Sequence, residues 1–147
     1  MKKALLTEII VALLVLLFLY AAFSKLFDLD QFRAGLGKQP LPPWLRSVLL
    51  WLLLPAELAT AVLMVPMRTR LAGLVAFTLL MALFTGYIAA VLLHWFPWVP
   101  CTCGGVISRL SWRQHLLFNL FFLSLGLLGI WLTIFHARNQ DQTAKPV

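Results

Sequence analysis

Four long apolar blocks constrain this sequence more than any other feature. They cover residues 4–23, 47–67, 71–96 and 116–135. A helix needs roughly 20 mainly apolar residues to cross the hydrocarbon core of a bilayer, so each block is long enough for one crossing. Charged residues make up only 12% of the chain, and most of them lie between the blocks. The sequence therefore predicts an all-α integral membrane bundle of four transmembrane helices.

The spacing of the blocks predicts one transmembrane domain over residues 1–147. We expect its helices at about 4–26, 45–67, 70–96 and 113–136, followed by a polar tail over 137–147. The longest stretch without an apolar block, residues 24–46, is too short to form a soluble core. The first block also resembles a signal peptide. The bulky Phe23 and the adjacent Lys25 at the candidate cleavage site favour a retained helix instead.

The orientation follows from details of the charge pattern. Four crossings place both termini on one side, and the 12 Lys and Arg residues then divide equally between the two sides, so their number gives no orientation. The Lys2-Lys3 pair and the short basic turn "MRTR" favour cytoplasmic termini, while Asp28 and Asp30 dilute the positive charge on the other side. We expect a multi-pass protein of the bacterial inner (cytoplasmic) membrane, with the turn before the fourth helix facing the periplasm. The net charge of +7 suits anionic lipid headgroups and gives no basis for nucleic-acid binding.

Polar residues within the blocks gather toward the periplasmic side. Glu57 lies near the middle of the second block, where an acidic residue is costly and commonly functional. Alternatively, Glu57 is protonated and serves only as a structural hydrogen-bonding group. Lys25 ends the first helix, where a snorkelling anchor is the more common role than a ligand. Tyr87 lies in the outer part of the third helix. This distribution predicts a polar site that opens outward.

A second set of polar residues begins a stripe along the fourth helix. His115 and Asn119 stand one turn apart, and the same face continues through Phe122, Gly126, Gly129 and Thr133. Small residues at this spacing are typical of helix packing in membranes, and the Ala82, Gly86, Ala90 series of the third helix has the same pattern. We therefore expect His115 and Asn119 to point into the bundle. For His115, packing and a functional role remain equal alternatives.

The two cysteines of the chain, Cys101 and Cys103, stand one residue apart in a turn rich in proline and glycine. On the periplasmic side such thiols can form a disulfide, although the short spacing demands a bent backbone. A bridge over so short a loop adds little stability, whereas strained, exposed disulfides are commonly labile or catalytic. Arg109, Arg113, Lys25 or His115 would stabilise a thiolate. The pattern favours a redox pair.

Two other interpretations of the cysteines stay open. Both thiols can be inert and unpaired. Together with His94 and His115 they would also make a Cys2His2 set, which zinc accepts. The one-residue spacing is unusual for zinc, so no metal is expected.

Three motifs in order carry a resemblance to a known family. The segments "AAFSKLFDLDQF", "LPAELATAVL" and "CTCGG…SWRQH" resemble the MauE/DoxX family of redox-associated membrane proteins over nearly the whole chain. The resemblance implies a compact four-helix bundle with a role in thiol–disulfide chemistry at the outer membrane face. In the methylamine-utilisation branch it implies maturation of a disulfide-rich periplasmic enzyme alongside a thioredoxin-like partner. It assigns Cys101 and Cys103 as the redox pair and matches Glu57 and Lys25 without giving them roles.

The predicted function is thus a thiol–disulfide oxidoreductase that acts on an exported or thioredoxin-like protein. Its site residues are Cys101, Cys103, Glu57 and Lys25, supported by His115, Arg113, Asn119 and Tyr87. With no second cysteine pair, the other electron donor or acceptor is a partner protein or a membrane quinone. The direction of electron flow and the identity of the attacking cysteine stay open. The alternative from another class is a non-enzymatic membrane scaffold for a partner protein.

Overall fold

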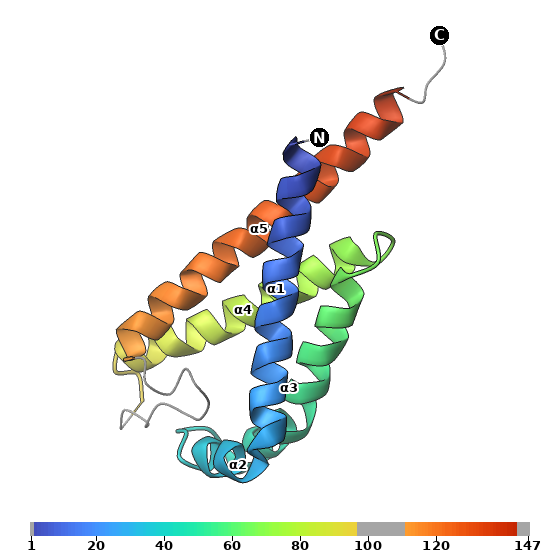
Figure 1. Ribbon diagram of the computed structural model, residues 1–147. Coiled ribbons are helices and arrows are strands. Elements are labelled where there is room, and N and C mark those ends of the chain that lie inside the picture. The colour runs from blue at the N-terminus through green and yellow to red at the C-terminus, as the bar shows by residue number, and fades with distance from the viewer. Residues whose placement is uncertain (1, 97–110, 144–147) are drawn as a thin grey trace.

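The computed structural model describes the backbone of residues 2–96 and 111–143 and the side chains of residues 4–96 and 111–136. Within these ranges the chain is all helical (Figure 1). The helices are α1 (Lys2–Phe27), α2 (Leu29–Gly37), α3 (Pro43–Met64), α4 (Arg70–Leu92) and α5 (Trp112–Thr143). All but α2 contain a segment long and apolar enough to span a membrane. The predicted fold class, a helical membrane bundle with four crossings, is confirmed.

The long helices alternate in direction. α1 packs against α3 and α5, and α4 packs against α3 and α5. α1 begins and α5 ends at one end of the bundle, which also holds the turn between α3 and α4; we name this the terminal end (Figure 1). The opposite end, named the α2 end, holds α2, the ends of α1 and α4, and the beginnings of α3 and α5 (Figure 1). Residues 97–110 join α4 to α5 and lie outside the described residues, as both cysteines do.

The packed core of the bundle lies toward the terminal end. Its members are the buried residues Ile10, Val11, Leu14, Phe18, Ala61, Met64, Leu74, Phe77, Met81 and Leu132. The rings of Phe18 and Phe77 lie with centroids 4.4 Å apart. α3 and α4 approach closely because Gly73 has no side chain: a Cβ there would lie 2.6 Å from the backbone nitrogen of Met64. Apolar packing between all four long helices therefore fixes this half of the molecule.

The small residues of α5 pack as predicted, but Gly86 of the series predicted for α4 does not. A Cβ on Gly126 would meet the hydroxyl of Thr78 at 2.7 Å, and one on Gly129 would meet Leu74 at 3.2 Å. Gly86, in contrast, is exposed and has nothing within 4 Å of such a Cβ. The packing face of α4 is the buried series Leu74, Phe77, Met81, Thr85 and Ile88. The predicted packing role of Gly86 is wrong because this face turns it outward.

Local capping signals explain the helix ends at the α2 end. α4 stops at Leu92, short of the predicted residue 96, because His94 adopts a left-handed backbone (φ 56°). The amide of His94 donates to the carbonyl of Val91, and that of Trp95 to the carbonyl of Ala90, both at 3.1 Å. These bonds form a Schellman motif, which terminates a helix. α5 begins with a capping box in which the Ser111 amide donates to the Gln114 side chain at 2.9 Å.

The short helix α2 was not expected from the sequence. The carboxylate of Asp28 accepts from the amide of Gln31 at 3.0 Å and caps its first turn. The loop that follows is fixed by Arg46, whose guanidinium donates to the carbonyls of Leu41 and Gly37 at 2.7 and 2.9 Å. Residues 28–42 thereby fold across the end of the bundle instead of forming an extended linker.

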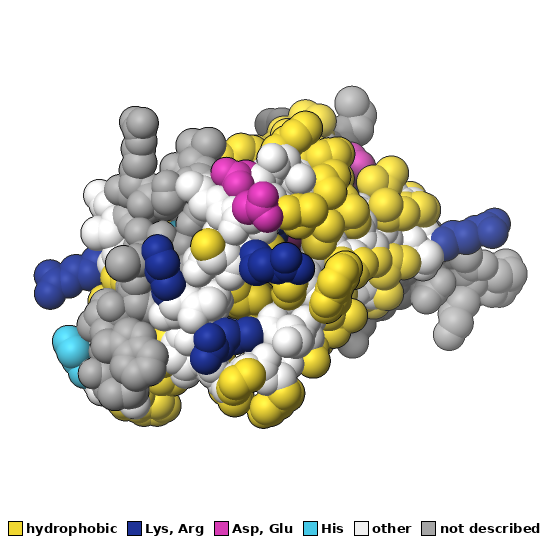
Figure 2. Space-filling view, turned by 90° about the horizontal axis from the view of Figure 1, so that it is seen from below, with side chains coloured by type: hydrophobic (Ala, Val, Ile, Leu, Met, Phe, Trp, Pro, Cys, Tyr) yellow, Lys and Arg dark blue, Asp and Glu magenta, His cyan; other side chains and the backbone are white. Residues whose placement is uncertain are grey.

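The outer surface matches a chain surrounded by lipid. Trp51, Leu83 and Leu117 are examples of large apolar side chains that the bundle leaves exposed. The view onto the α2 end instead shows Lys, Arg and acidic side chains, with hydrophobic side chains beside them (Figure 2). Asp28, Asp30, Arg33 and Lys38 are exposed on this segment. The chain is a multi-pass membrane protein with a charged cap at its α2 end.

Candidate functional site

A buried ion pair joins α1 to α3 in the half of the bundle nearer α2. The ammonium of Lys25 lies 2.8 Å from Oε1 and 3.0 Å from Oε2 of Glu57. The side chain of Glu57 is 4% exposed and that of Lys25 is 17% exposed. Charges so far removed from water are tolerated only when they are paired and hydrogen-bonded. Two of the residues predicted for the site are therefore in direct contact.

Helix geometry brings these two side chains together. Side chains on a helix lean toward its N-terminus, so Lys25, near the end of α1, points back into the bundle. Its ammonium also donates to the carbonyl of Ala21 at 3.1 Å and lies 5.9 Å from the centre of the Phe32 ring. Glu57 shares the buried face of α3 with Leu53 and Thr60. Lys25 therefore faces inward, opposite to the snorkelling that is common for a lysine at this position.

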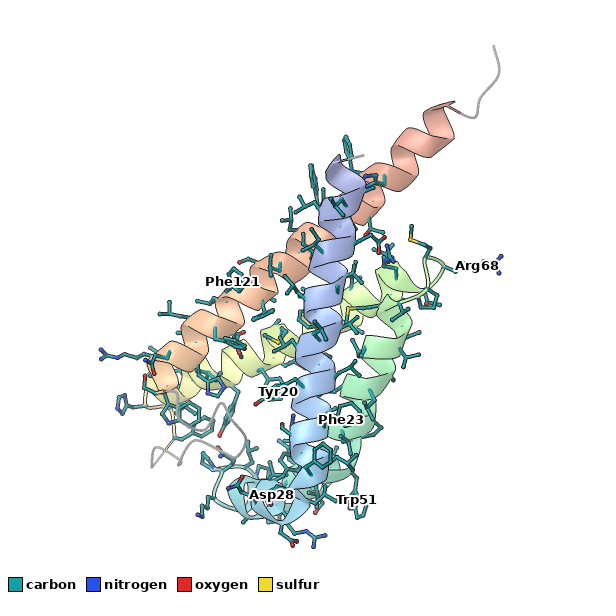
Figure 3. All side chains as sticks on the ribbon, in the orientation of Figure 1. Tyr20, Phe23, Asp28, Trp51, Arg68 and Phe121 are labelled. Carbon is teal, nitrogen blue, oxygen red and sulfur yellow. The ribbon has the colours of Figure 1, made fainter. Side chains whose placement is uncertain are left out.

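The ion pair lines a cavity of about 470 Å³ in the half of the bundle nearer α2. α1, α3, α4 and α5 contribute to its walls, and Phe32, Leu36, Gln39 and Leu41 contribute from α2 and the loop after it. In Figure 3, Tyr20 of this lining points from α1 toward the side of α4 and α5, while Trp51 and Phe121 lie on the outside of the bundle. The cavity therefore adjoins the packed core on the side nearer α2, and the side chains of Phe18 and Met81 belong to both.

Most of the polar residues predicted for the site line this one cavity. Lys25 and Glu57 are joined there by Tyr87 of α4 and by His115 and Asn119 of α5. Arg113 does not belong to the lining and is exposed on the first turn of α5. Cys101 and Cys103 lie outside the described residues. The structure therefore brings together five of the predicted residues, which come from four different stretches of sequence.

Among the cavity residues that the sequence analysis did not predict, Gln39 and Trp112 carry hydrogen-bonding side chains. Gln39 is buried in the loop after α2, and its side-chain oxygen accepts a hydrogen bond from the hydroxyl of Tyr87. Trp112 contributes to the lining from the first turn of α5. The available signal for Gln39 was the pair Asp28 and Gln31, an acidic cap three residues before an amide, which is typical of a helix start.

A second ion pair, also missed, lies toward the terminal end. The guanidinium of Arg70 contacts Glu8 at 2.6 and 3.2 Å and also donates to the carbonyls of Met64 and Val65. Glu8 is 52% exposed, so this pair is much less buried than that of Lys25 and Glu57. It ties α1 to the beginning of α4, and neither residue lines the cavity. We interpret it as a structural contact.

The cavity is equipped for proton exchange and hydrogen bonding within an apolar wall. Lys25 and Glu57 together carry no net charge, and two amides, an imidazole and a phenol lie on the other walls, from Gln39, Asn119, His115 and Tyr87. Among the described residues, no group of three or more His, Cys, Asp or Glu side chains is placed to hold a metal ion. The chemistry available from the described walls is therefore that of titratable and hydrogen-bonding side chains.

Comparison with known families identifies the chain. Residues 3–132 match the family described as methylamine utilisation protein MauE. The chain belongs to the MauE family. The match covers all four membrane-spanning helices up to Leu132 and includes the ion pair and the cavity of this MauE-family protein. No curated protein sequence and no solved structure matches the chain.

Proposed function

We propose that this MauE-family protein exchanges disulfides with an exported partner protein, using Cys101 and Cys103 as its redox pair. The proposal rests mainly on where the cysteine-containing segment joins the bundle, between the end of α4 and the beginning of α5. Tyr87 lies in the last turns of α4 and Trp112 in the first turn of α5, and both line the cavity. The chain therefore leaves α4 and enters α5 at the walls of the cavity that holds Lys25 and Glu57.

The exchange proceeds through a mixed disulfide. A thiolate of the partner attacks one sulfur of the Cys101–Cys103 disulfide and releases the other cysteine as a thiolate. The second thiol of the partner then attacks the mixed disulfide, which leaves the partner oxidised and both cysteines reduced. Two electrons and two protons pass to this chain. The same steps in reverse reduce a partner disulfide.

The groups of the cavity would serve this exchange as proton carriers. Thiol exchange requires a thiolate, so a nearby acceptor for the thiol proton speeds it. Glu57 is the carboxylate of the cavity, and Lys25 holds it in place through two hydrogen bonds. We assign the pair to proton transfer, with His115 as a further titratable group of the lining. Arg113 would act by its charge alone.

The partner is a thioredoxin-like or other cysteine-containing protein on the periplasmic side of the bacterial inner membrane. This assignment rests on the orientation that the Lys2-Lys3 pair and the basic turn before α4 favour. A role in maturing a disulfide-rich enzyme of methylamine utilisation fits the family match. The likeness to DoxX proteins stays a prediction.

Single cysteine variants test the proposal. Cys101→Ser or Cys103→Ser removes the resolving thiol, so one of the two should accumulate a mixed disulfide with the natural partner. The measurement is a non-reducing gel of each variant purified from its native membrane. We expect a reductant-sensitive band of higher mass in one single variant and none in the double variant. If both single variants keep full function and trap nothing, the redox proposal fails and a scaffold explains the protein better.

The role of Glu57 has a matched control. Glu57→Gln keeps the size of the side chain but removes its ability to carry a proton, so thiol exchange should slow by about 100-fold, the lower end for proton-transfer groups. Glu8→Gln makes the same change in the exposed ion pair and should leave the rate unchanged. Equal rates for both variants would make Glu57 a structural residue.

A further inference from the structure

The cavity contains a buried polar side chain that makes no hydrogen bond to any other residue the structure describes. Asn119 is 7% exposed. Among the described residues nothing hydrogen-bonds to its amide, which lines the cavity. One turn earlier, His115 also lines the cavity and makes no side-chain hydrogen bond to a described residue. Buried amides normally have partners. The amide and the imidazole lie on one helix face and are open to the same cavity. Together they offer hydrogen-bond donors and acceptors to a ligand.

The remaining walls define the chemistry of that ligand. Lys25 and Glu57 neutralise each other at 2.8 Å, so the cavity has no net charge to attract an ion or a charged headgroup. Most of the lining is apolar, including the aromatic residues Phe84, Phe118 and Trp112. Its volume of about 470 Å³ lies within the range of pockets that bind small molecules. The ligand is therefore neutral and largely apolar, with a small number of hydrogen-bonding atoms.

We propose that this cavity binds the ring of a membrane quinone. Asn119 can donate to an oxygen through its NH2 group or accept through its carbonyl, and a histidine ring has the same two capacities. The site can thus bond a quinone carbonyl and equally the hydroxyl formed when the quinone is reduced. Aromatic walls suit a flat ring, and a neutral ion pair does not repel it.

The proposal rests on the proposed thiol–disulfide function and names its electron acceptor. Oxidation of the two thiols to a disulfide forms one S–S bond and releases two electrons and two protons. Reduction of a quinone to a hydroquinone consumes the same two electrons and two protons. Because the chain has only two cysteines, no second disulfide within it can take these electrons. Bound in the cavity, the quinone would regenerate the disulfide after each exchange.

Binding can be tested without any thiol chemistry. The probe is decylubiquinone, titrated into the purified Cys101→Ser/Cys103→Ser double variant in lipid nanodiscs, with binding followed by calorimetry. Asn119→Leu keeps the size of the side chain and removes its hydrogen bonds, and should weaken binding about tenfold. Ala21→Phe introduces a ring from the cavity wall and should abolish binding. Ala82→Phe makes the same change at an exposed position of α4 and should bind normally.

The outcomes separate the two proposals. Equal affinity in all these variants, or no saturable binding at all, overturns the quinone site, and so does a cavity that binds only phospholipid and does not release it to decylubiquinone. If Ala21→Phe fails to fold, Asn119→Leu decides the question. A wild-type protein that exchanges disulfides but binds no quinone refutes the quinone site alone. A protein that binds quinone in the cavity while its thiols stay inert refutes the proposed exchange and leaves the site standing.

Discussion

Replacing Lys25 and Glu57 tests whether their ion pair makes the folded protein more stable than apolar side chains at the same positions would. The side chain of Lys25 is only 17% exposed and that of Glu57 only 4%, so each charge is stabilised mainly by the other. Removing one partner of a buried pair costs about 3–5 kcal/mol, since the remaining charge is left unpaired, whereas apolar replacement of both is often close to neutral. We expect Lys25→Met to destabilise the protein by about 3 kcal/mol and Glu57→Leu by about 2–3 kcal/mol. Glu57→Leu costs less because Lys25 keeps its hydrogen bond to Ala21.

The stability of the double variant decides between these explanations. Lys25→Met with Glu57→Leu leaves two apolar side chains against an apolar wall, so its stability should lie within about 1 kcal/mol of wild type. The coupling energy between the two sites, the sum of the two single losses less the loss in the double variant, is then at least about 4 kcal/mol. It is measured by unfolding the four proteins with SDS in mixed micelles, with helicity and tryptophan fluorescence as probes.

The exposed ion pair provides the control. The same cycle with Glu8→Leu and Arg70→Met should give a coupling energy below about 1 kcal/mol, because Glu8 is 52% exposed. A coupling energy for Lys25 and Glu57 no larger than that of the control refutes the reasoning. So does a double variant less stable than both single variants, because it would show that the charges themselves hold the bundle together.

Two further predictions concern topology and packing. A membrane-impermeant maleimide should label Cys101 or Cys103 in reductant-treated cells whose outer envelope is opened, and labelling only after the inner membrane is breached would invert the orientation. Gly73→Ala should destabilise the protein by about 1–3 kcal/mol, because its Cβ would lie 2.6 Å from the backbone of Met64. Gly86→Ala on the same helix meets nothing within 4 Å and should unfold at the same SDS fraction as wild type; equal effects of the two substitutions would contradict the packing described for Gly73.

The spacing of apolar blocks was sufficient to predict the bundle, because a membrane admits few alternatives to helices of about 20 residues. The α5 stripe was predictable for a related reason: a helix repeats every 3.6 residues, so Asn119, Gly126 and Gly129 had to share a face. Gly86 shows the limit of this argument. Small residues identify a face that permits close packing, but the α4 side chains Phe77 and Met81 compete for the interior and rotate Gly86 outward.

The contact between Lys25 and Glu57 could not be predicted from their positions in the sequence. Two residues 32 apart on adjacent helices meet only if both helices are rotated and offset correctly, and that depends on packing elsewhere in the bundle. α2 escaped prediction because nine residues without a buried side chain leave no clear periodic pattern. Only the cap at Asp28 marked it. Gln39 was missed with it, since its place on the cavity wall depends on the fold of this segment.

The two halves of the bundle differ in a way that argues for function in the one nearer α2. Toward the terminal end, apolar side chains fill the space between the long helices, and the ion pair of Glu8 and Arg70 is partly exposed. Toward the α2 end there is a cavity of about 470 Å³, a buried ion pair and, at Asn119, an amide with no hydrogen bond to any described residue. Each of these lowers stability relative to an apolar filling. Local departures from good packing of this kind are expected where a protein binds or reacts. Because the ion pair and the amide both lie on the walls of this cavity, a shared ligand explains all three features more simply than three separate structural compromises.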